Sequence, residues 1–311
     1  MIIQPEELNF SNKNIIMIIS GAPGTGKSTL ALSAPDALII DTDRGIARVN
    51  PAHRKASIQV NTYAELLADL EEIKQTQQYK TLIIDTAGEL IELLKEWAVQ
   101  TEPSARKKNG GVSLQGYGVV KSEFIRLSAE LRKLYNVIFV FHTAREKNGD
   151  DVSYELVCEG AARTMVWQPT DLGAYLQIIN GERFLGFTPT EQYNAKSAYG
   201  IKGLVRLPEL KDGEKNTFLT GLFDTVRRNL DSESAAYVKD KERYDAAMAE
   251  GTKLLKSINT PDDIDNVSKA LAAIDHALTS ETELKQAIMR QLNGKGWTWD
   301  KKAKQWTKAS E

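Results

Sequence analysis

The residues best suited to chemistry form a glycine-rich segment near the start of the chain. Residues 21–28 read GAPGTGKS and match the phosphate-binding pattern G-x-x-x-x-G-K-[ST] at every fixed position. Glycines let the backbone turn tightly and direct its N–H groups inward, while Lys27 would supply a charge to the outer phosphates and Ser28 a hydroxyl to Mg²⁺. The nucleotide-contacting residues that this pattern predicts are Gly21, Ala22, Pro23, Gly24, Thr25, Gly26, Lys27, Ser28 and Thr29.

The segments on both sides of this turn fit the same interpretation. Five apolar residues, Ile15 to Ile19, predict a buried parallel strand, and Leu30-Ala31-Leu32 opens a predicted helix. A helix start adds free backbone amides and the positive end of a dipole to a phosphate site. The order of strand, glycine-rich turn and helix therefore predicts that the chain binds a nucleoside triphosphate, ATP, together with Mg²⁺.

Acidic residues follow two other apolar segments. Residues 81–86, TLIIDT, have the Walker B pattern of a buried strand that ends in an acid, and Asp85 would support Mg²⁺ directly or through a bound water. Residues 37–41, ALIID, predict a second buried strand, and its end carries Asp41 and Asp43. These carboxylates are candidates for the metal and hydrolytic chemistry of a nucleotide site.

A histidine follows a third apolar segment. Residues 137–141, VIFVF, predict a core strand that ends at His142. A polar side chain at that position in a phosphate-loop sheet can sense the terminal phosphate, but it can equally be an ordinary structural histidine. The sequence leaves both interpretations open.

The composition limits the class of protein. The 311 residues are 41% hydrophobic and 26% charged with a net charge of -2, so any contact with nucleic acid must come from local basic patches. A single cysteine, Cys158, excludes an internal disulfide and a multi-cysteine zinc site and is interpreted as a small hydrophobic residue. No apolar segment is long enough to cross a membrane, and we expect a cytoplasmic protein.

The periodicity predicts an α/β fold with a mainly parallel central sheet, followed by a helical region and a short aromatic tail. The expected domains are residues 1–212, 213–293 and 294–311. Asn180-Gly181 predicts a hairpin between strands 172–179 and 183–188. The expected helices are 63–75, 88–99, 117–134, 161–167, 216–230, 233–257, 261–278 and 281–293, with Ser232 and Thr260 as N-caps.

Three segments combine positive charge with an expected loop or hairpin. Loop 100–116 contains Arg106, Lys107 and Lys108, and a second charged loop, 145–153, contains Arg145 and Lys147; each is either a solvated surface loop or a nucleic-acid contact. The tail suits either stacking on single-stranded bases or a self-packed hairpin. Its aromatic and basic residues are Trp297, Trp299, Trp306, Lys295, Lys301, Lys302, Lys304 and Lys308.

The order of these motifs resembles the RecA-like ATPase core. More specifically, the segments GAPGTGKSTLA, LIIDTDRG, TLIIDT, the helix with QGYG and FIRL, and VIFVFHTAREK resemble a phage-encoded family of nucleotide-binding proteins. Members of that family act as RecA-like single-strand annealing recombinases. The resemblance covers roughly residues 13–206.

The resemblance implies an ATPase of a phage-infected cell that assembles with itself, as a ring or filament, on single-stranded DNA. The resemblance also suggests a single-strand-binding protein as a further partner. It implies that Asp43 polarises the attacking water, as a shorter substitute for a glutamate, which favours slow hydrolysis. It also implies that His142 senses phosphate and that loops 100–116 and 145–160 contact DNA. Lys196 would reach into the ATP site of a neighbouring copy.

Two other classes of function stay open. A loader or motor protein would use ATP as a switch and hold a replication or packaging partner through residues 216–311. A small-molecule kinase would need an arginine-rich lid over its acceptor, and the arginines of the relevant region are scattered along the sequence. They are Arg145, Arg163, Arg183 and Arg206.

Overall fold

A computed structural model describes residues 10–149, 151–159, 161–210, 214–300 and 305–308. The chain divides into two compact units, one of residues 10–229 and a second that contains the residues from 230 onward. All the predicted nucleotide-contacting residues lie in the first unit. Among the described residues, none of the helices has both the length and the apolar character of a membrane span.

The first unit is built on a ten-stranded sheet with the order β10-β8-β7-β1-β5-β4-β2-β3, from which β6 and β9 branch. Neighbouring strands from β7 to β3 in this order pair in parallel, which confirms the predicted α/β fold with a mainly parallel sheet. The parallel strands are β1 (Ile16–Gly21), β2 (Ala37–Asp41), β3 (Ser57–Gln59), β4 (Thr81–Asp85), β5 (Asn136–Asn148) and β7 (Leu172–Ile179).

Antiparallel strands extend the sheet beyond β7. The predicted hairpin is confirmed, because Asn180 and Gly181 have φ angles of 52° and 85° and join β7 to β8 (Glu182–Gly186). Positive φ at both turn positions matches the right-handed twist of the strands, which is why Asn-Gly is favoured there. The remaining strands at this side are β9 (Lys196–Ser197) and β10 (Leu204–Arg206).

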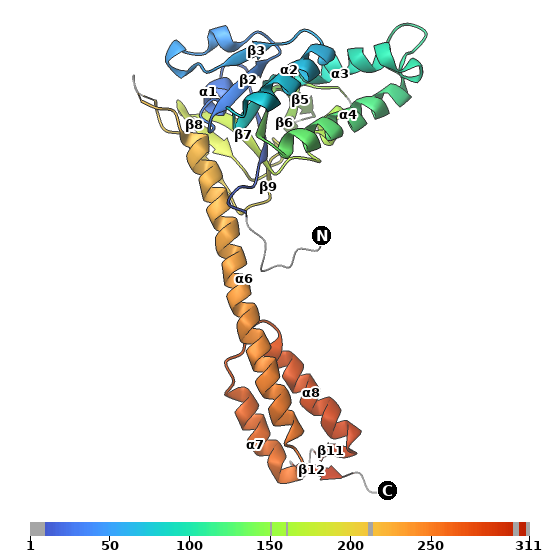
Figure 1. The fold of residues 1–311 in the computed structure, drawn as a ribbon, viewed down its shortest axis with the longest axis vertical. Coiled ribbons are helices and arrows are strands. Elements are labelled where there is room, and N and C mark those ends of the chain that lie inside the picture. Colours follow the sequence, from blue (N-terminus) through green and yellow to red (C-terminus); the bar gives the residue numbers. More distant parts are fainter. Residues whose placement is uncertain (1–9, 150, 160, 211–213, 301–304, 309–311) are drawn as a thin grey trace. The chain divides into compact units, whose positions relative to one another are not determined.

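Several helices pack against one face of the sheet and share a hydrophobic core with it (Figure 1). The Thr62 hydroxyl accepts from the Glu65 amide while the Glu65 carboxylate accepts from the Thr62 amide, a capping box that starts the first of them. These helices are α2 (Tyr63–Thr76), α3 (Ala87–Thr101), α4 (Leu114–Arg132) and α5 (Ala162–Met165). Short 3₁₀ turns, η2 (Ile46–Arg48), η3 (Pro51–His53) and η4 (Pro103–Ala105), lie in the connections.

The segment that follows the phosphate-loop helix α1 (Lys27–Ala31) contacts the first turn of the long helix α6 (Phe218–Lys256). The Leu219 amide donates to the Ser33 hydroxyl at 2.9 Å, and the Thr220 hydroxyl donates to the Ser33 carbonyl at 2.9 Å. Leu219, Phe223 and Val226 are fully buried. These contacts hold the start of α6 against the segment that follows α1.

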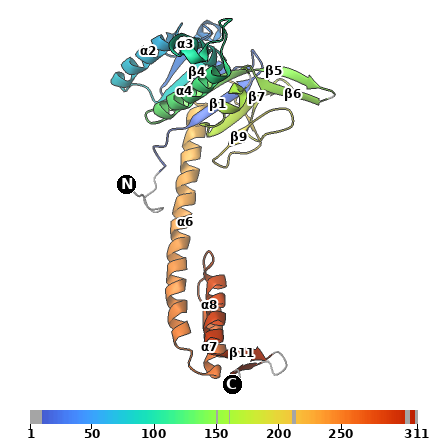
Figure 2. The ribbon, with the colours of Figure 1, turned by 90° about the vertical axis from the view of Figure 1, so that its right-hand side faces the viewer.

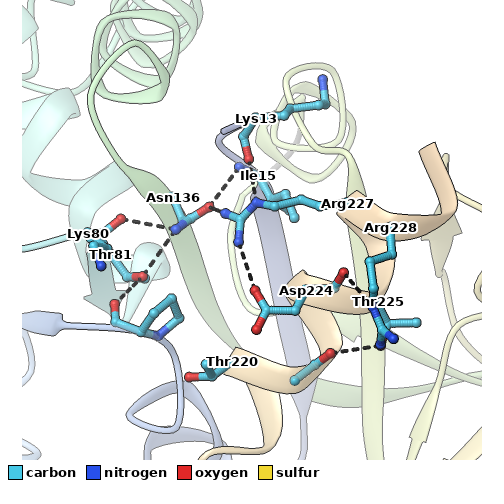
Figure 3. Close-up of polar contacts among 12 residues, drawn as sticks. Lys13, Ile15, Lys80, Thr81, Asn136, Thr220, Asp224, Thr225, Arg227 and Arg228 are labelled. Atoms are coloured by element: carbon cyan, nitrogen blue, oxygen red, sulfur yellow. Dashed lines mark hydrogen bonds and ion pairs between the residues drawn. The ribbon is translucent and has the colours of Figure 1, made fainter. Parts of the chain in front are cut away.

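One arginine of α6 is also bonded to the sheet (Figure 3). Arg227 donates through Nε to the Lys13 carbonyl at 3.1 Å and through Nη2 to the Asn136 side-chain carbonyl at 3.1 Å. That same Asn136 oxygen accepts from the Ile15 amide at 3.1 Å, and its amide group donates to the Lys80 carbonyl at 3.1 Å. Asn136 therefore joins the starts of β1, β4 and β5, and Arg227 ties α6 to that junction.

Several sequence-based predictions are wrong in their boundaries; for example, the expected helix 261–278 ends at Ala272. Strand β5 does not end at His142 but continues to Asn148 and pairs with β6 (Asp151–Leu156), so the expected loop at 145–153 is a β-hairpin. Figure 2 shows this hairpin reaching past the neighbouring strands. The high charge of residues 145–151 predicts a loop, whereas the strand signal lies in the alternation of apolar and polar residues over 152–156, which pairs β6 with β5.

The predicted helices 216–230 and 233–257 form a single helix, α6, of 39 residues, and Ser232 lies inside it. A serine can cap a helix but does not force one to end, and no glycine or proline interrupts the chain near it. Helix α4 also begins earlier than predicted, because the Ser113 hydroxyl caps it by accepting from the Gly116 amide at 3.0 Å.

The second unit is mainly helical. After α6 come α7 (Pro261–Ala272) and α8 (Ser280–Gly294), and Thr260 forms the predicted N-cap through a capping box with Asp263. Strands β11 (Trp297–Asp300) and β12 (Gln305–Lys308) pair antiparallel, as expected for the tail, while Lys301, Lys302 and Lys304 lie outside the described residues. Trp297 is only 7% exposed, and its ring is part of the hydrophobic core that the helices of this unit form.

The anchor around Asn136 predicts a specific loss of stability. Replacing Arg227 with Met removes two hydrogen bonds to groups of the sheet and should lower the free energy of unfolding by about 1–3 kcal/mol. Urea denaturation of the full chain measures this change.

The neighbouring Arg228 provides the matched control, because its described bonds go to the Asp224 carbonyl and the Thr225 hydroxyl within α6. Arg228→Met should change stability by about 0.5 kcal/mol or less. Equal losses in both variants would contradict the role assigned to Arg227.

Candidate nucleotide-binding site

The parallel register brings the predicted site residues to one edge of the sheet. Gly21, at the end of β1, lies opposite His142 on β5, and Asp41 of β2 lies opposite Asp85 of β4. The chain after β2 is fastened to the chain after β4, because the Thr42 hydroxyl donates to the Thr86 carbonyl at 2.8 Å. In doubly wound sheets, ligands bind at the carboxyl ends of the strands, so this edge is the expected place for a site.

The glycine-rich segment forms a loop whose backbone encloses a concave space. Gly24 and Gly26 have φ angles of 78° and 99°. Residues that carry a Cβ rarely adopt this left-handed backbone conformation. The Thr25 hydroxyl and the Lys27 amine both donate to the Ala22 carbonyl, at 2.9 and 2.8 Å. The fold therefore provides the cradle that a phosphate chain requires, and Lys27 already lies across it.

Lys27 faces carboxylates across the site. Its side chain is almost fully buried, and burial lowers the pKa of its amine to about 8, although Asp85 and Asp43 act in the opposite direction. Burial likewise raises the pKa of Asp85 to about 6, opposed by a hydrogen bond from Ser28. Ser28 and Asp85 thus lie next to each other, as a hydroxyl and a carboxylate that share a magnesium ion must.

The two aspartates after β2 differ in what they contact. The Asp41 carboxylate accepts from the amides of Gly45 and Ile46, at 2.6 and 3.2 Å, so both of its oxygens hold the following loop in place. Asp43 pairs with Arg48 through Oδ2 at 2.7 Å, and its Oδ1 is buried with no hydrogen-bond partner among the described residues. Of the two, Asp43 is therefore the carboxylate with an oxygen available to accept a hydrogen bond from a water.

His142 lies within the same group although its strand continues beyond it. Its Nδ1 atom is buried with no partner among the described residues. Burial, assisted by the charge of Lys27, lowers the pKa of the imidazole, so the ring is neutral near pH 7. A neutral imidazole can donate one hydrogen bond to a phosphate oxygen without adding a full charge to the site.

These residues fit a magnesium nucleotide. Buried polar atoms without partners normally indicate a ligand or water, and here two of them, on Asp43 and His142, belong to the group that surrounds Lys27. Within the described residues, no group of three or more histidine, cysteine, aspartate or glutamate side chains could hold a metal by itself. Mg²⁺ would therefore be held by Ser28 and Asp85 together with the phosphates and waters, which is how this ion usually binds.

Sequence analysis missed one residue at the phosphate loop. Arg183, on β8, donates through Nε to the Thr25 carbonyl at 3.0 Å. The two residues are 158 positions apart, and no local pattern around Arg183 marks it. The Asn180-Gly181 turn is the sequence signal that could have indicated Arg183. It fixes where β8 begins, and β8 lies near the phosphate loop because its neighbour β7 pairs with β1.

Other predicted site residues lie away from this group. Lys196, on β9, lies opposite Gly173 of β7, and Gly173 in turn lies opposite Ile18 of β1, three residues before Gly21. The Lys196 amine donates to the Trp167 carbonyl at 3.1 Å. The exposed residues Arg106, Lys107 and Lys108 lie between η4 and α4, and the exposed residues Arg145 and Lys147 lie on the β5–β6 hairpin.

Comparison with known proteins agrees with this geometry. The family model for the AAA domain matches residues 13–199, which span β1 to β9. The chain belongs to the AAA domain family. The family is one of P-loop NTPases, which bind and hydrolyse ATP with Mg²⁺, and the match identifies no phage or recombinase family. No curated protein matches the chain.

The opposed charges of Lys27 and Asp85 predict how nucleotide binding depends on pH. Below about pH 6 Asp85 becomes protonated and no longer supports Mg²⁺, and above about pH 8 Lys27 loses its charge. The affinity for Mg·ATP should therefore be highest between these values and fall by up to about tenfold per pH unit outside them. Isothermal titration calorimetry from pH 5 to pH 9.5, a range of about 4.5 units, measures the profile.

An Asp85→Asn variant is the control for the acid side. The weaker affinity of this variant should not fall further between about pH 7 and pH 5, because the group that titrates is gone. An acid limb identical to that of the unmodified protein would show that another group, not Asp85, is responsible.

Proposed function

We propose that this protein is an ATPase that binds single-stranded DNA and promotes annealing or recombination in phage DNA metabolism. Support for the nucleotide half is the group formed by Lys27, Ser28, Asp85, Asp43 and His142 at one sheet edge. Support for the DNA half is that β5 carries His142 and, three and five residues later, the exposed cations Arg145 and Lys147. The strand that would sense phosphate is thus also the strand that would touch DNA.

The proposed hydrolysis depends on position and charge. Lys27 and the loop amides hold the triphosphate, while Ser28 and Asp85 hold Mg²⁺, which neutralises phosphate charge when it is bound. The free oxygen of Asp43 orients a water toward the terminal phosphate, and His142 donates to one of that phosphate's oxygens. Arg48 already occupies one oxygen of Asp43, so only the other oxygen is left to orient the water, which favours slow hydrolysis.

The proposed coupling to DNA runs along β5. Residues Arg145 and Lys147 are exposed on the hairpin, and Arg163 of α5 pairs with Glu146 at 2.8 Å. A shift of His142 on loss of the terminal phosphate would move the hairpin through a continuous hydrogen-bonded strand. This is the kind of two-state change that nucleotide switches use.

The proposed partners are single-stranded DNA, other copies of this chain and a single-strand-binding protein. The alternative is an ATP-dependent loader or motor whose helical unit holds a replication or packaging protein. For that alternative, removal of the residues from 230 onward would abolish binding of the protein partner and leave DNA binding intact.

A small-molecule kinase is a third candidate, and the structure adds one observation in its favour. Arg183 and Arg206, which are separated in the sequence, line the same cavity beside the phosphate loop. Arg206 is paired with Glu182, however, and Arg183 is bonded to the loop itself. ATP consumption that needs a nucleoside or sugar acceptor and ignores DNA would favour the kinase.

Substitution of Asp43 tests the hydrolytic assignment. Asp43→Asn should lower the ATPase rate by about 100-fold or more, because the water loses its acceptor, and change the affinity for ATP about twofold or less. Lys27→Ala should abolish both binding and hydrolysis. Steady-state ATPase assays with and without single-stranded DNA measure the rates, and an unchanged rate in Asp43→Asn would refute its role.

Charge removal on the β5–β6 hairpin tests the DNA contact. The double variant Arg145→Ala, Lys147→Ala should weaken single-strand binding and reduce the slope of log affinity against log salt concentration by about 1.4, or 0.7 per phosphate contact. Lys253 and Lys256, exposed in the last turn of α6, give a control of equal charge. If the two double variants weakened DNA binding equally, the loss would reflect the overall charge of the protein and not a contact of the hairpin with DNA, which would contradict the proposal.

A further inference from the structure

Helix α8 is held in the second unit by one of its faces. Leu284, Ile288 and Leu292 are buried in the hydrophobic core that α8 shares with α6 and α7. A Cβ placed on Gly251 of α6 would lie 2.4 Å from Cδ1 of Leu284, so a larger residue there would push the two helices apart. This packing fixes the rotation of α8 about its own axis and therefore decides which side chains it exposes.

The opposite face of α8 has an uncharged centre with a cation on each side. At 3.6 residues per turn, four exposed residues fall within about 60° of arc and form one stripe along the helix. They are Thr282, Gln286, Met289 and Asn293, of which Met289 is 46% exposed. Lys285 and Arg290 are also exposed and lie about 70° to either side of the middle of this stripe.

The two cations make only local contacts. Lys285 pairs with Glu281 one turn earlier, and Arg290 donates to the Gln286 side chain at 3.5 Å. Exposed pairs of this kind contribute little free energy, so both cations can turn toward a ligand at low cost. An open cavity of about 460 Å³ lies over this face, bordered among the described residues by α8 side chains.

Positive charge is concentrated in this part of the second unit. Residues 281–308 contain seven Lys or Arg and three Asp or Glu, whereas residues 230–280 contain six and ten. Strand β11 begins three residues after α8 ends, and the buried ring of Trp297 anchors it to the helices (Figure 1). The basic segment therefore stays close to α8, and its charge favours a polyanionic partner.

We propose that α8 is a recognition helix that enters the major groove of duplex DNA. An α-helix with its side chains is about 10–12 Å across and fits the groove of B-form DNA, which is about 12 Å wide, whereas the narrow groove of an RNA duplex excludes it. Gln286 and Asn293 can each pair with the N6 and N7 groups of an adenine, and Met289 can contact a thymine methyl group.

The flanking cations complete this arrangement. With the uncharged stripe against the base edges, Lys285 and Arg290 point to the two walls of the groove, where each contacts a phosphate. The site belongs to the second unit, whereas Arg145 and Lys147 belong to the first. The inference adds a site for duplex DNA to the proposed function and depends on neither nucleotide nor single-strand binding.

Selection from a library of DNA duplexes with a randomised centre tests base reading by the stripe. The full chain, without nucleotide, should enrich a short motif that contains A·T pairs. The double variant Gln286→Ala, Met289→Ala should bind the enriched duplex about tenfold or more weakly, no better than a scrambled duplex, with an unchanged dependence of affinity on salt. Retained binding to the scrambled duplex shows that this variant is folded.

Charge removal tests the flanking cations. The double variant Lys285→Ala, Arg290→Ala should weaken binding to the enriched and scrambled duplexes alike. It should reduce the slope of log affinity against log salt concentration by about 1.8, or 0.9 per phosphate contact. The control Lys253→Ala, Lys256→Ala removes equal charge from α6 of the same unit and should leave both affinities and the slope unchanged.

The results separate this inference from the proposed function. The double variant Arg145→Ala, Lys147→Ala should lose affinity for single strands and still enrich the same duplex motif. If the unmodified protein enriches no motif, as expected when α8 binds another protein instead, the inference is overturned. A motif that survives Gln286→Ala, Met289→Ala, or equal effects of the two charge variants, would overturn it as well.

Discussion

The amine of Lys27 facing the carboxylates of Asp85 and Asp43 is the interaction on which the rest of the site depends. Burial disfavours the charged form of Lys27 and of Asp85, as the lowered pKa of the amine and the raised pKa of Asp85 show. Each charge partly compensates the other, but full compensation needs a ligand that carries both phosphate and Mg²⁺. The site is thus prepared electrostatically for a magnesium nucleotide, and the parallel sheet holds these side chains in place.

Strand β5 connects this site to the exterior of the unit. It lies between β1 and β4 in the sheet, carries His142 beside the phosphate loop and then continues into the hairpin with β6, where Arg145 and Lys147 are exposed. The other side of the phosphate loop is held by Arg183 and Asn216, which link it to β8 and to the segment before α6. The loop is therefore braced from both sides by elements that are distant in sequence.

The sequence predicted the parts of the site that depend on local pattern. The phosphate loop, the strands that end at Asp41 and Asp85, and the Asn-Gly hairpin each follow from short-range chemistry. The extension of β5 and the continuity of α6 through Ser232 were missed because pairing with β6 and helix propagation override weak local signals. Arg183 could not be found, because its contact with Thr25 depends on which strands become neighbours in the sheet.

Thermal melting of the full chain with Mg·ATP at about pH 7.5 tests the central claim most directly. We predict that saturating Mg·ATP raises the melting temperature by several degrees in the unmodified protein, because the ligand compensates charges that are buried in the folded state alone, and that it has no effect on Lys27→Ala. An unmodified protein that melts at the same temperature with and without Mg·ATP would contradict the account.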